Sequence, residues 1–371
     1  MAFGAIKKLI PLSVKIWLKA RLPDKVGGIG GGDLSDIPNS LSPQRLAILR
    51  HMEGIFAQRP LDIALETITV CNARCVFCAY RKTKRETEVM SMELYKKILD
   101  EYAQMGGGPL GFAPYLADPL LDPKLFDRLK MAKEYGVFIL HTFTNGIRFA
   151  KFTEDQLEEY VSSMDTLNIS MGGLDREEYQ KMFGVDKFDE VWSSLERIST
   201  MVKRKGLKTR VQIHFRTHDQ AALEQHPRYK QLGEMGIKHI FIMTSFNSWG
   251  GVVTQEDLPG AATILKAVNS PPIGGCAIPV TEMTILPNGD VAACGCYDGK
   301  LQTLMGNVAK DSVAGVWQGE AYTAFRKHFM GQRLHPLCEK CGFYIPYENL
   351  LSNPGLEGYQ PKDGIFWSRI S

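Results

Sequence analysis

Long uncharged apolar runs are missing from this 371-residue sequence. No window of about 18 apolar residues is free of charge, so we expect no transmembrane helix. An excess of one charge sign is also missing, because 44 Lys and Arg stand against 41 Asp and Glu for a net charge of +3. A protein with so little net charge lacks the excess of positive charge that nucleic-acid binding requires, and we expect no nucleic-acid partner. The composition is that of an ordinary globular protein.

The N-terminal region, residues 1–55, mixes basic and apolar residues and then a glycine-rich connector. Its charges are dispersed among the apolar positions and no small-residue cleavage site follows, which argues against a signal peptide. Pro11 interrupts the amphipathic helix, and apolar residues lie on more than one face. We therefore favour packing against the rest of the protein over weak contact with an anionic membrane surface. We expect a cytoplasmic protein that is at most peripheral to the membrane.

Cysteine is scarce, with 8 residues in the whole chain. In a reducing cytoplasm, closely spaced cysteines indicate metal ligation or catalysis rather than structural disulfides. Each cysteine is therefore informative by itself.

Residues 56–250 alternate short β-branched apolar runs with longer helical periodicity. Repeated βα units predict a parallel sheet, and six of them suit a partial (β/α)6 barrel with functional loops at the carboxyl ends of the strands. We therefore predict an α/β fold. The expected strands are 61–69, 111–116, 137–143, 166–170, 208–215 and 239–243, and the expected helices are 92–105, 123–135, 154–163, 186–203 and 220–235.

After residue 250 the pattern becomes irregular. Pro287 to Asp290 is a hairpin signal between two short apolar runs. We predict a small C-terminal module over 251–345, followed by an aromatic tail over 346–371 that caps it. A lid over the substrate is the alternative role for this tail.

Three cysteines stand together directly after the first expected strand, as Cys71, Cys75 and Cys78 in the pattern C-x3-C-x2-C. Three thiolates on one short loop can hold three corners of a cubane iron–sulfur cluster and leave the fourth iron without a protein ligand. A zinc knuckle is the alternative, but it needs four ligands and no fourth Cys or His lies nearby in sequence.

This motif resembles the signature of the radical S-adenosylmethionine (SAM) enzymes, and the resemblance covers about residues 60–345. It implies that Cys71, Cys75 and Cys78 ligate a [4Fe–4S] cluster whose open iron chelates the amino and carboxylate groups of SAM. Phe77 would lie beside the adenine. Reduction by an external one-electron donor, such as flavodoxin or ferredoxin, would cleave SAM to methionine and a deoxyadenosyl radical that abstracts a substrate hydrogen.

Later strand ends extend the resemblance. Residues 116–123 look like the family's Gly-Gly-Glu-Pro segment, which holds the methionine amino group, with Ala117 and Asp118 where Gly and Glu are usual. Asn145 resembles a polar residue at the next strand end. Ser170, after a further strand, would approach the SAM ribose.

The other five cysteines lie between residues 276 and 341. Cys276 precedes the hairpin, Cys294 follows it, and Cys338 and Cys341 form a C-x2-C pair. Four such thiolates describe either a closed structural zinc site or a fully ligated iron–sulfur cluster, and spacing does not separate the two. Beside a radical SAM motif the arrangement resembles the twitch module, the shortened relative of the SPASM domain, which implies one auxiliary [4Fe–4S] cluster on these four residues.

Cys296 is then the spare thiol, although Cys294 and Cys296 compete for the fourth corner. One interpretation of Cys296 is a small buried apolar residue. The other is a catalytic hydrogen-atom donor that returns a hydrogen to the opposite face of a substrate radical.

Polar residues also fall on positions of the expected strands that alternate toward a barrel interior, namely Glu66, Gln212, His214 and Arg216. They could hold a polar substrate, although for His214 a hydrogen-bonded place in the core is favoured. Trp249 precedes two glycines, and we interpret this turn as a hinge between the modules rather than a site.

Together these features predict a radical SAM oxidoreductase or epimerase (isomerase) with a polar small-molecule substrate. The resemblance points to oxidation or epimerisation of a hydroxyl-bearing carbon in a sugar or aminocyclitol, and the spare thiol favours epimerisation. Oxidation of the same carbon to a ketone, peptide maturation, and a non-enzymatic iron–sulfur or zinc protein are the alternatives.

Overall fold

The computed structural model describes residues 57–112, 115–135, 137, 140–266, 276, 278–330 and 335–342. The predicted N-terminal helix and the aromatic tail therefore lie outside the described residues. Among the described helices, none combines the length and the apolar character that crossing a bilayer needs.

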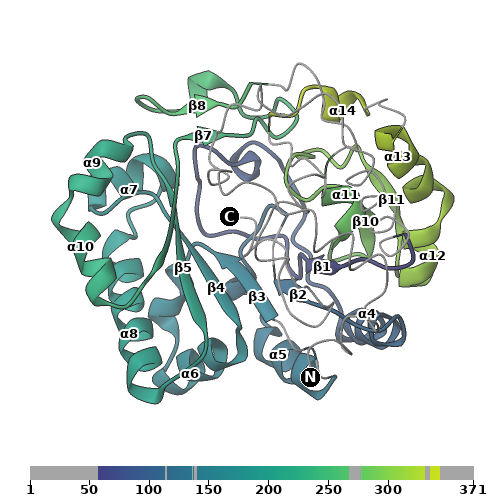
Figure 1. The fold of residues 1–371 in the computed structure, drawn as a ribbon, viewed down its shortest axis with the longest axis horizontal. Helices are drawn as coiled ribbons and strands as arrows, with labels where there is room; N and C mark the ends of the chain where they lie inside the picture. The colour runs from purple at the N-terminus through teal and green to yellow at the C-terminus, as the bar shows by residue number, and fades with distance from the viewer. Residues whose placement is uncertain are drawn as a thin grey trace, which may run out of the picture.

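A nine-stranded sheet forms the centre of the molecule, in the order β11-β10-β9-β1-β2-β3-β4-β5-β6. Strands β1 to β6 are all parallel to their neighbours, as the predicted βα repeats require. Figure 1 shows these strands fanning across the molecule, with helices along the outer side. The strands are β1 (Asp62–Leu65), β2 (Leu110–Phe112), β3 (Leu140–Thr144), β4 (Thr166–Met171), β5 (Arg210–Arg216), β6 (His239–Met243), β9 (Glu282–Ile285), β10 (Asp290–Ala292) and β11 (Leu304–Asn307).

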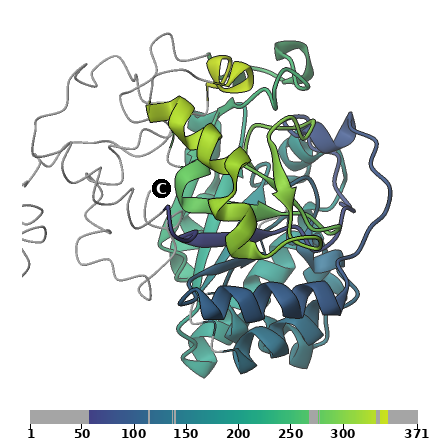
Figure 2. The ribbon, with the colours of Figure 1, turned by 90° about the vertical axis from the view of Figure 1, so that its right-hand side faces the viewer.

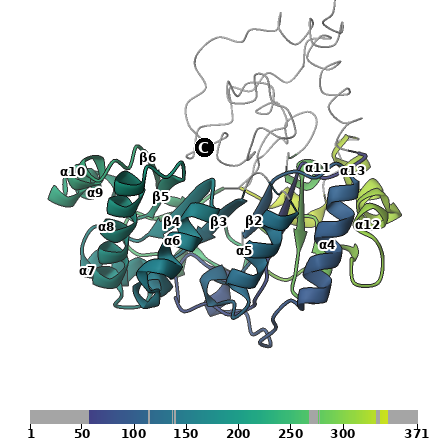
Figure 3. The same ribbon diagram turned by 90° about the horizontal axis from the view of Figure 1, so that it is seen from below.

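The helices between the parallel strands cover one face of the sheet, which Figure 3 shows from below. Several begin at a residue whose side chain caps the first turn, such as Ser91 and Thr153. The helices are α4 (Met92–Gln104), α5 (Leu125–Glu134), α6 (Glu154–Ser163), α7 (Arg176–Phe183), α8 (Phe188–Lys205), α9 (Gln220–Gln225) and α10 (Pro227–Glu234), followed later by α11 (Ile278–Thr281), α12 (Val313–Gln318), α13 (Glu320–Met330) and α14 (Pro336–Glu339).

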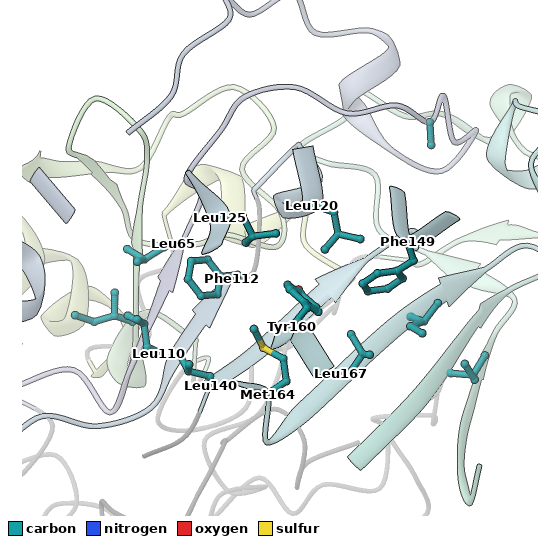
Figure 4. Close-up of a cluster of buried hydrophobic side chains, with 14 of the residues drawn as sticks. Leu65, Leu110, Phe112, Leu120, Leu125, Leu140, Phe149, Tyr160, Met164 and Leu167 are labelled. Carbon is teal, nitrogen blue, oxygen red and sulfur yellow. The ribbon is translucent and has the colours of Figure 1, made fainter. Parts of the chain in front are cut away.

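The apolar core fills the space between the sheet and these helices. Alternate strand residues such as Leu65, Phe112 and Leu167 are fully buried there. Figure 4 shows these side chains in one cluster with Tyr160 of α6 and with Met164, the residue that follows this helix. The other alternate residues are therefore turned toward the barrel interior, which is where the polar residues of the strands lie.

The C-terminal module continues the barrel sheet. Strand β9 pairs in parallel with β1, and the predicted hairpin follows it as β9 and β10. Figure 2 shows the green and yellow module beside the purple β1. A hydrogen bond of 2.7 Å from the Val313 amide to Glu101 on α4 ties the module to the barrel. Residue 251 therefore separates two parts of one continuous sheet.

Two features of the barrel differ from the sequence-based expectation. The predicted helix 220–235 is two helices, because Pro227 cannot donate its backbone hydrogen bond within a continuous helix. In addition, α7 was not predicted at all. Its eight residues are mostly polar, so the apolar periodicity that marks a helix is short.

Candidate active site at the carboxyl ends of the barrel strands

The loop with Cys71, Cys75 and Cys78 begins shortly after β1 and is held in place by α7. The amides of Arg74 and Val76, on either side of Cys75, donate to the carbonyls of Phe183 and Met182, both at 2.9 Å. These carbonyls lie at the C-terminal end of α7, where the helix leaves them without a partner of its own. The helix that was missed in the sequence is thus the support of the predicted ligand loop.

The three thiols of this loop lie within electrostatic reach of one another. The Cys71 Sγ accepts hydrogen bonds from the Ala73 amide at 3.5 Å and the Asn145 Nδ2 at 3.6 Å. Burial raises the pKa of Cys71 to about 12 and that of Cys78 to about 11. Burial also raises the pKa of Cys75 far above its usual range, and the charges of Cys78 and Cys71 add to this. Half-buried thiols with such raised pKa values are ionised by binding metal rather than by water.

Asp118 and Asn145 hold the next two strand ends to this loop. The Asp118 carboxylate accepts from the Asn145 amide at 2.7 Å, from the Thr144 hydroxyl at 2.9 and 3.0 Å, and from the Leu120 amide at 3.1 Å. Burial raises the pKa of Asp118 to about 6, although these hydrogen bonds lower it. Both oxygens of Asp118 are thus engaged within the protein, so a contact with the methionine amino group stays a prediction.

Three other predicted cofactor contacts lie around the same loop. Ala117 is half-buried next to Asp118, and Ser170 is half-buried near the end of β4. The Phe77 ring stacks on Phe246, with ring centroids 5.1 Å apart. Their proximity to adenine and ribose stays a prediction.

Some polar side chains in the barrel interior are already hydrogen-bonded within the protein. His214 is buried, donates from its Nε2 to Asn168 Oδ1 at 3.0 Å, and stacks on Phe241 with ring centroids 4.6 Å apart. Burial lowers its pKa to about 3, so it is neutral. This confirms the favoured interpretation of His214 as a core histidine. Glu66 is fully buried and receives both Arg85 Nη atoms, at 2.9 and 2.6 Å, which uses its carboxylate within the protein.

Arg216, the last residue of β5, occupies a different position. Its guanidinium donates to the thioether of Met243, and among the described residues it pairs with no carboxylate. Burial lowers its pKa to about 10, while the charges of Cys75, Cys296 and Cys78 act in the opposite direction. Arg216 therefore lies within electrostatic reach of two predicted ligands in the first loop and of Cys296 in the C-terminal module.

The C-terminal cysteines also gather in one place. Burial is the largest cause that raises the pKa of Cys338, and the charges of Cys294 and Cys276 raise it further. The Tyr297 ring packs on Cys341 in the same cluster. The Cys294 Sγ accepts the Cys296 amide at 3.4 Å. Such N–H···S hydrogen bonds favour the thiolate form and thus support Cys294 as the ligand. Cys296 also interacts with this group, because burial and then Cys294, Glu282 and Cys276 raise its pKa.

Sequence reasoning did not assign two residues, Trp249 and Asp298, to the site, and Trp249 connects its two parts. The Trp249 Nε1 donates to the Phe77 carbonyl at 3.0 Å, and a Cβ on Gly299 would come within 2.9 Å of the Trp249 carbonyl. Trp249 thus contacts both the first loop and the C-terminal module, which is more than a hinge. Asp298 orders the turn after Cys296 by accepting from the Thr303 amide and hydroxyl at 2.6 and 2.7 Å.

Family models match two separate regions of the chain. The Radical SAM superfamily model matches residues 65–217, and the SPASM model, an iron–sulfur cluster-binding domain, matches residues 276–342. The chain carries a radical SAM domain. The two matches contain the first three cysteines and all five C-terminal ones, respectively.

Curated relatives of this radical SAM protein match over only part of their length. The GTP 3',8-cyclase of Chlorobaculum tepidum is 26% identical over 138 residues, which are 37% of this chain and 40% of that protein. The GTP 3',8-cyclase of Vibrio parahaemolyticus is 24% identical over 159 residues, or 42% and 46%. The matched region thus spans less than half of each relative.

Two solved structures share the fold. The structure of Streptococcus suis SuiB bound to precursor peptide SuiA matches with a TM-score of 0.56 and 16% identity, and covers 87% of this chain and 79% of that one. Native anSMEcpe with bound AdoMet matches with a TM-score of 0.51 and 15% identity, and covers 73% and 84%. At these identities the likeness shows the fold, a radical SAM partial barrel with a small C-terminal module.

The cofactors are accordingly a SAM-binding [4Fe–4S] cluster, SAM and an auxiliary iron–sulfur cluster. The donor sets fit this assignment, because soft thiolates select iron–sulfur clusters and the thiols of each group lie within electrostatic reach of one another. Within the described residues, no three His, Cys, Asp or Glu side chains converge as they would around a single metal ion. The ligand roles of the individual cysteines stay predictions.

Proposed function

We propose that the protein epimerises a hydroxyl-bearing carbon of a sugar or aminocyclitol-type substrate, with Cys296 as the hydrogen donor. The observation that carries this proposal is the position of Arg216. Its guanidinium interacts with Cys75 and Cys78 of the first loop and with Cys296. Cys296 is the C-terminal cysteine that shares this neighbour, which supports a place for Cys296 on the side of the C-terminal module that is nearer the first loop.

The bound cluster and SAM supply a deoxyadenosyl radical that removes one hydrogen atom from the substrate carbon. The protein's own part is to position the substrate and to return a hydrogen. The Cys296 S–H bond breaks as a new C–H bond forms on the opposite face of the carbon. The sulfur radical left on Cys296 then needs one electron and one proton, and an external reductant of the flavodoxin or ferredoxin class supplies the electron.

The proposal requires a protonated thiol at Cys296. The environment raises the pKa of Cys296 well above its usual range, with burial as the largest cause. A protonated thiol keeps the hydrogen atom that the reaction needs, whereas a thiolate has none to give. A cysteine that ligates the auxiliary cluster would likewise have lost its proton.

An anaerobic assay tests the proposal. The protein is incubated with SAM, a strong reductant and a panel of sugars and aminocyclitols, each deuterated at one carbinol carbon at a time. Deuterium in deoxyadenosine identifies the substrate and the carbon. The unlabelled substrate is then incubated in D2O, and deuterium in its product identifies the returned hydrogen. We expect an epimer that carries one solvent-derived deuterium. A ketone without solvent label would show a dehydrogenase and contradict the epimerase proposal.

The same assay includes two further substrates as separate arms. GTP represents the reaction named for the curated relatives, and a peptide library represents the substrate class of SuiB. Deuterium transfer from either, with none from sugars or aminocyclitols, would contradict the proposed substrate class while leaving the radical SAM assignment intact. Bound zinc with little iron after anaerobic reconstitution would contradict an enzyme of this kind.

The N-terminal segment is tested separately. Liposome flotation of the full-length protein is compared with that of a version starting at Leu34. Because we propose that the segment packs on the barrel, we expect equal flotation. Stronger flotation of the full-length protein on anionic vesicles would show a membrane contact instead.

A further inference from the structure

Tyr179 on α7 carries a buried hydroxyl without a hydrogen-bond partner among the described residues. The whole residue is 0% exposed. Buried hydroxyls almost always have a partner, because leaving one unpaired costs free energy. Such a group next to a cofactor site indicates a partner that the polypeptide itself does not supply.

The position of Tyr179 is fixed by the same helix that holds the ligand loop. Tyr179, Met182 and Phe183 lie on one face of α7, three and four residues apart. The Met182 and Phe183 carbonyls accept the amides that flank Cys75, and the Tyr179 ring stacks on Phe183 with centroids 4.8 Å apart. Tyr179 is thus one helical turn from the two carbonyls that hold the backbone around Cys75.

The groups that act on this hydroxyl come from separate segments. Besides burial, which is the largest cause, the charges of Cys75, Asp118 and Cys71 raise the pKa of Tyr179 well above its usual range. Cys71 and Cys75 belong to the ligand loop, whereas Asp118 follows β2. Together with the stacking of the Tyr179 ring on Phe183, whose carbonyl holds the loop, this places the hydroxyl on the side of the ligand loop that faces α7.

We propose that the Tyr179 hydroxyl donates a hydrogen bond to a sulfur atom of the SAM-binding [4Fe–4S] cluster and thereby raises its reduction potential. The acceptor is the Cys75 thiolate or the inorganic sulfide beside it. An added electron makes the sulfur atoms more negative, so a donor stabilises the reduced cluster more than the oxidised one. Tyr179 is therefore a positioning residue that acts through the cluster, and this role is independent of the substrate.

The substitution Tyr179→Phe tests the proposal because it keeps the ring and removes only the hydroxyl. The holoenzyme is titrated anaerobically with the reduced cluster followed by electron paramagnetic resonance, and the change of signal on adding SAM identifies the SAM-binding cluster. We expect the equilibrium constant for its reduction to fall about tenfold, which corresponds to about 59 mV for one electron. The auxiliary cluster should keep its potential.

Tyr160→Phe is the matched control. Tyr160 is also 0% exposed, but it lies on α6 and packs on Phe149, with ring centroids 5.4 Å apart. Removing the Tyr160 hydroxyl should leave the reduction potential of the SAM-binding cluster unchanged. An unchanged potential in Tyr179→Phe with full iron content, or an equal fall in both variants, would overturn the proposal.

A second readout covers the case in which Tyr179→Phe binds too little iron to titrate. A fluorinated tyrosine at position 179 keeps the hydroxyl and makes it a stronger donor, so the potential should rise. In the same protein, electron–nuclear double resonance in D2O should detect an exchangeable proton coupled to the reduced cluster. An unchanged potential together with no such proton would overturn the proposal.

Discussion

Gly184 and the Arg74 carbonyl are in such close contact that a Cβ on Gly184 would lie 2.4 Å from that oxygen. Gly184 ends α7 with a φ of 67°, and Arg74 is part of the ligand loop. The helix that carries Tyr179 and the loop that carries Cys75 therefore meet at a position where only glycine fits.

This contact predicts that Gly184→Ala displaces the ligand loop. We expect the variant to lose iron from the SAM-binding cluster and most of its reductive SAM cleavage, because the loop must move to admit the methyl group. Gly206→Ala is the matched control, since Gly206 ends α8 with a φ of 61° and has nothing within 4 Å of its Cβ position. Both variants carry the backbone strain of about 1 kcal/mol or more. Equal iron contents in the two would contradict the role of this contact.

The buried pair of His141 and Asp62 predicts a pH dependence of stability. Their Nε2 and Oδ2 atoms are 2.9 Å apart, and both residues are 0% exposed. Burial lowers the pKa of His141, but the Asp62 charge and hydrogen bond outweigh it, so the pKa is raised overall. The pair then stabilises the folded protein fully below about pH 6.5, the pKa of His in the unfolded chain. This contribution is lost as the pH rises through the higher pKa of His141 in the folded protein.

We therefore expect the thermal unfolding midpoint of the holoprotein to fall as the pH rises above about 6.5. His141→Gln should remove this component and destabilise the protein by about 3–5 kcal/mol, because it leaves the buried Asp62 charge unpaired. Anaerobic thermal unfolding of both proteins over a pH series measures this. The same pH slope in both would show that another group is responsible.

The ion pair between Arg85 and Glu66 supports the segment before the ligand loop. Burial raises the pKa of Glu66, and Arg85 opposes this effect. We expect Arg85→Met to destabilise the protein by about 3–5 kcal/mol, since a buried carboxylate loses its partner. Adding Glu66→Gln should recover part of this lost stability. In the unsubstituted protein the Leu116 backbone N–H donates to Glu66 Oε1 at 2.7 Å, and the side-chain oxygen of Gln can accept the same hydrogen bond. A double variant no more stable than the single one would contradict this account.

The two cluster sites should be separable. Replacing Cys71, Cys75 and Cys78 together with Ala should abolish SAM cleavage while iron stays at the auxiliary site, because each cluster has its own ligands. Iron analysis and deoxyadenosine formation are measured on the same sample. Reductive cleavage that persists in the triple variant would reject this loop as the SAM-binding site.

Local patterns were sufficient for much of the fold. The predicted strands and most helices agree with the structure, because apolar periodicity and capping residues act within a few neighbours of each position. The ligand motif was also readable, since Cys71, Cys75 and Cys78 lie on one loop directly after a strand.

The contacts between distant segments could not be predicted in this way. Nothing in the local sequence indicates that the end of α7 binds the ligand loop, or that Arg216 on β5 approaches Cys296. The parallel pairing of β9 with β1 likewise joins residues more than 200 positions apart. Such contacts depend on how the strands are ordered in the sheet, which a single sequence does not specify.

Cys296→Ala, studied with the substrate that the deuterium-transfer assay identifies, tests the central claim most directly. We expect both clusters to remain and deoxyadenosine still to form. The substrate radical should then accumulate or give a shunt product, and the epimer should be absent. Epimer formation at the original rate in a fully loaded Cys296→Ala enzyme would contradict the role of Cys296. Loss of auxiliary iron in this variant, with iron retained in Cys294→Ala, would show that the ligand and the donor are the other way round.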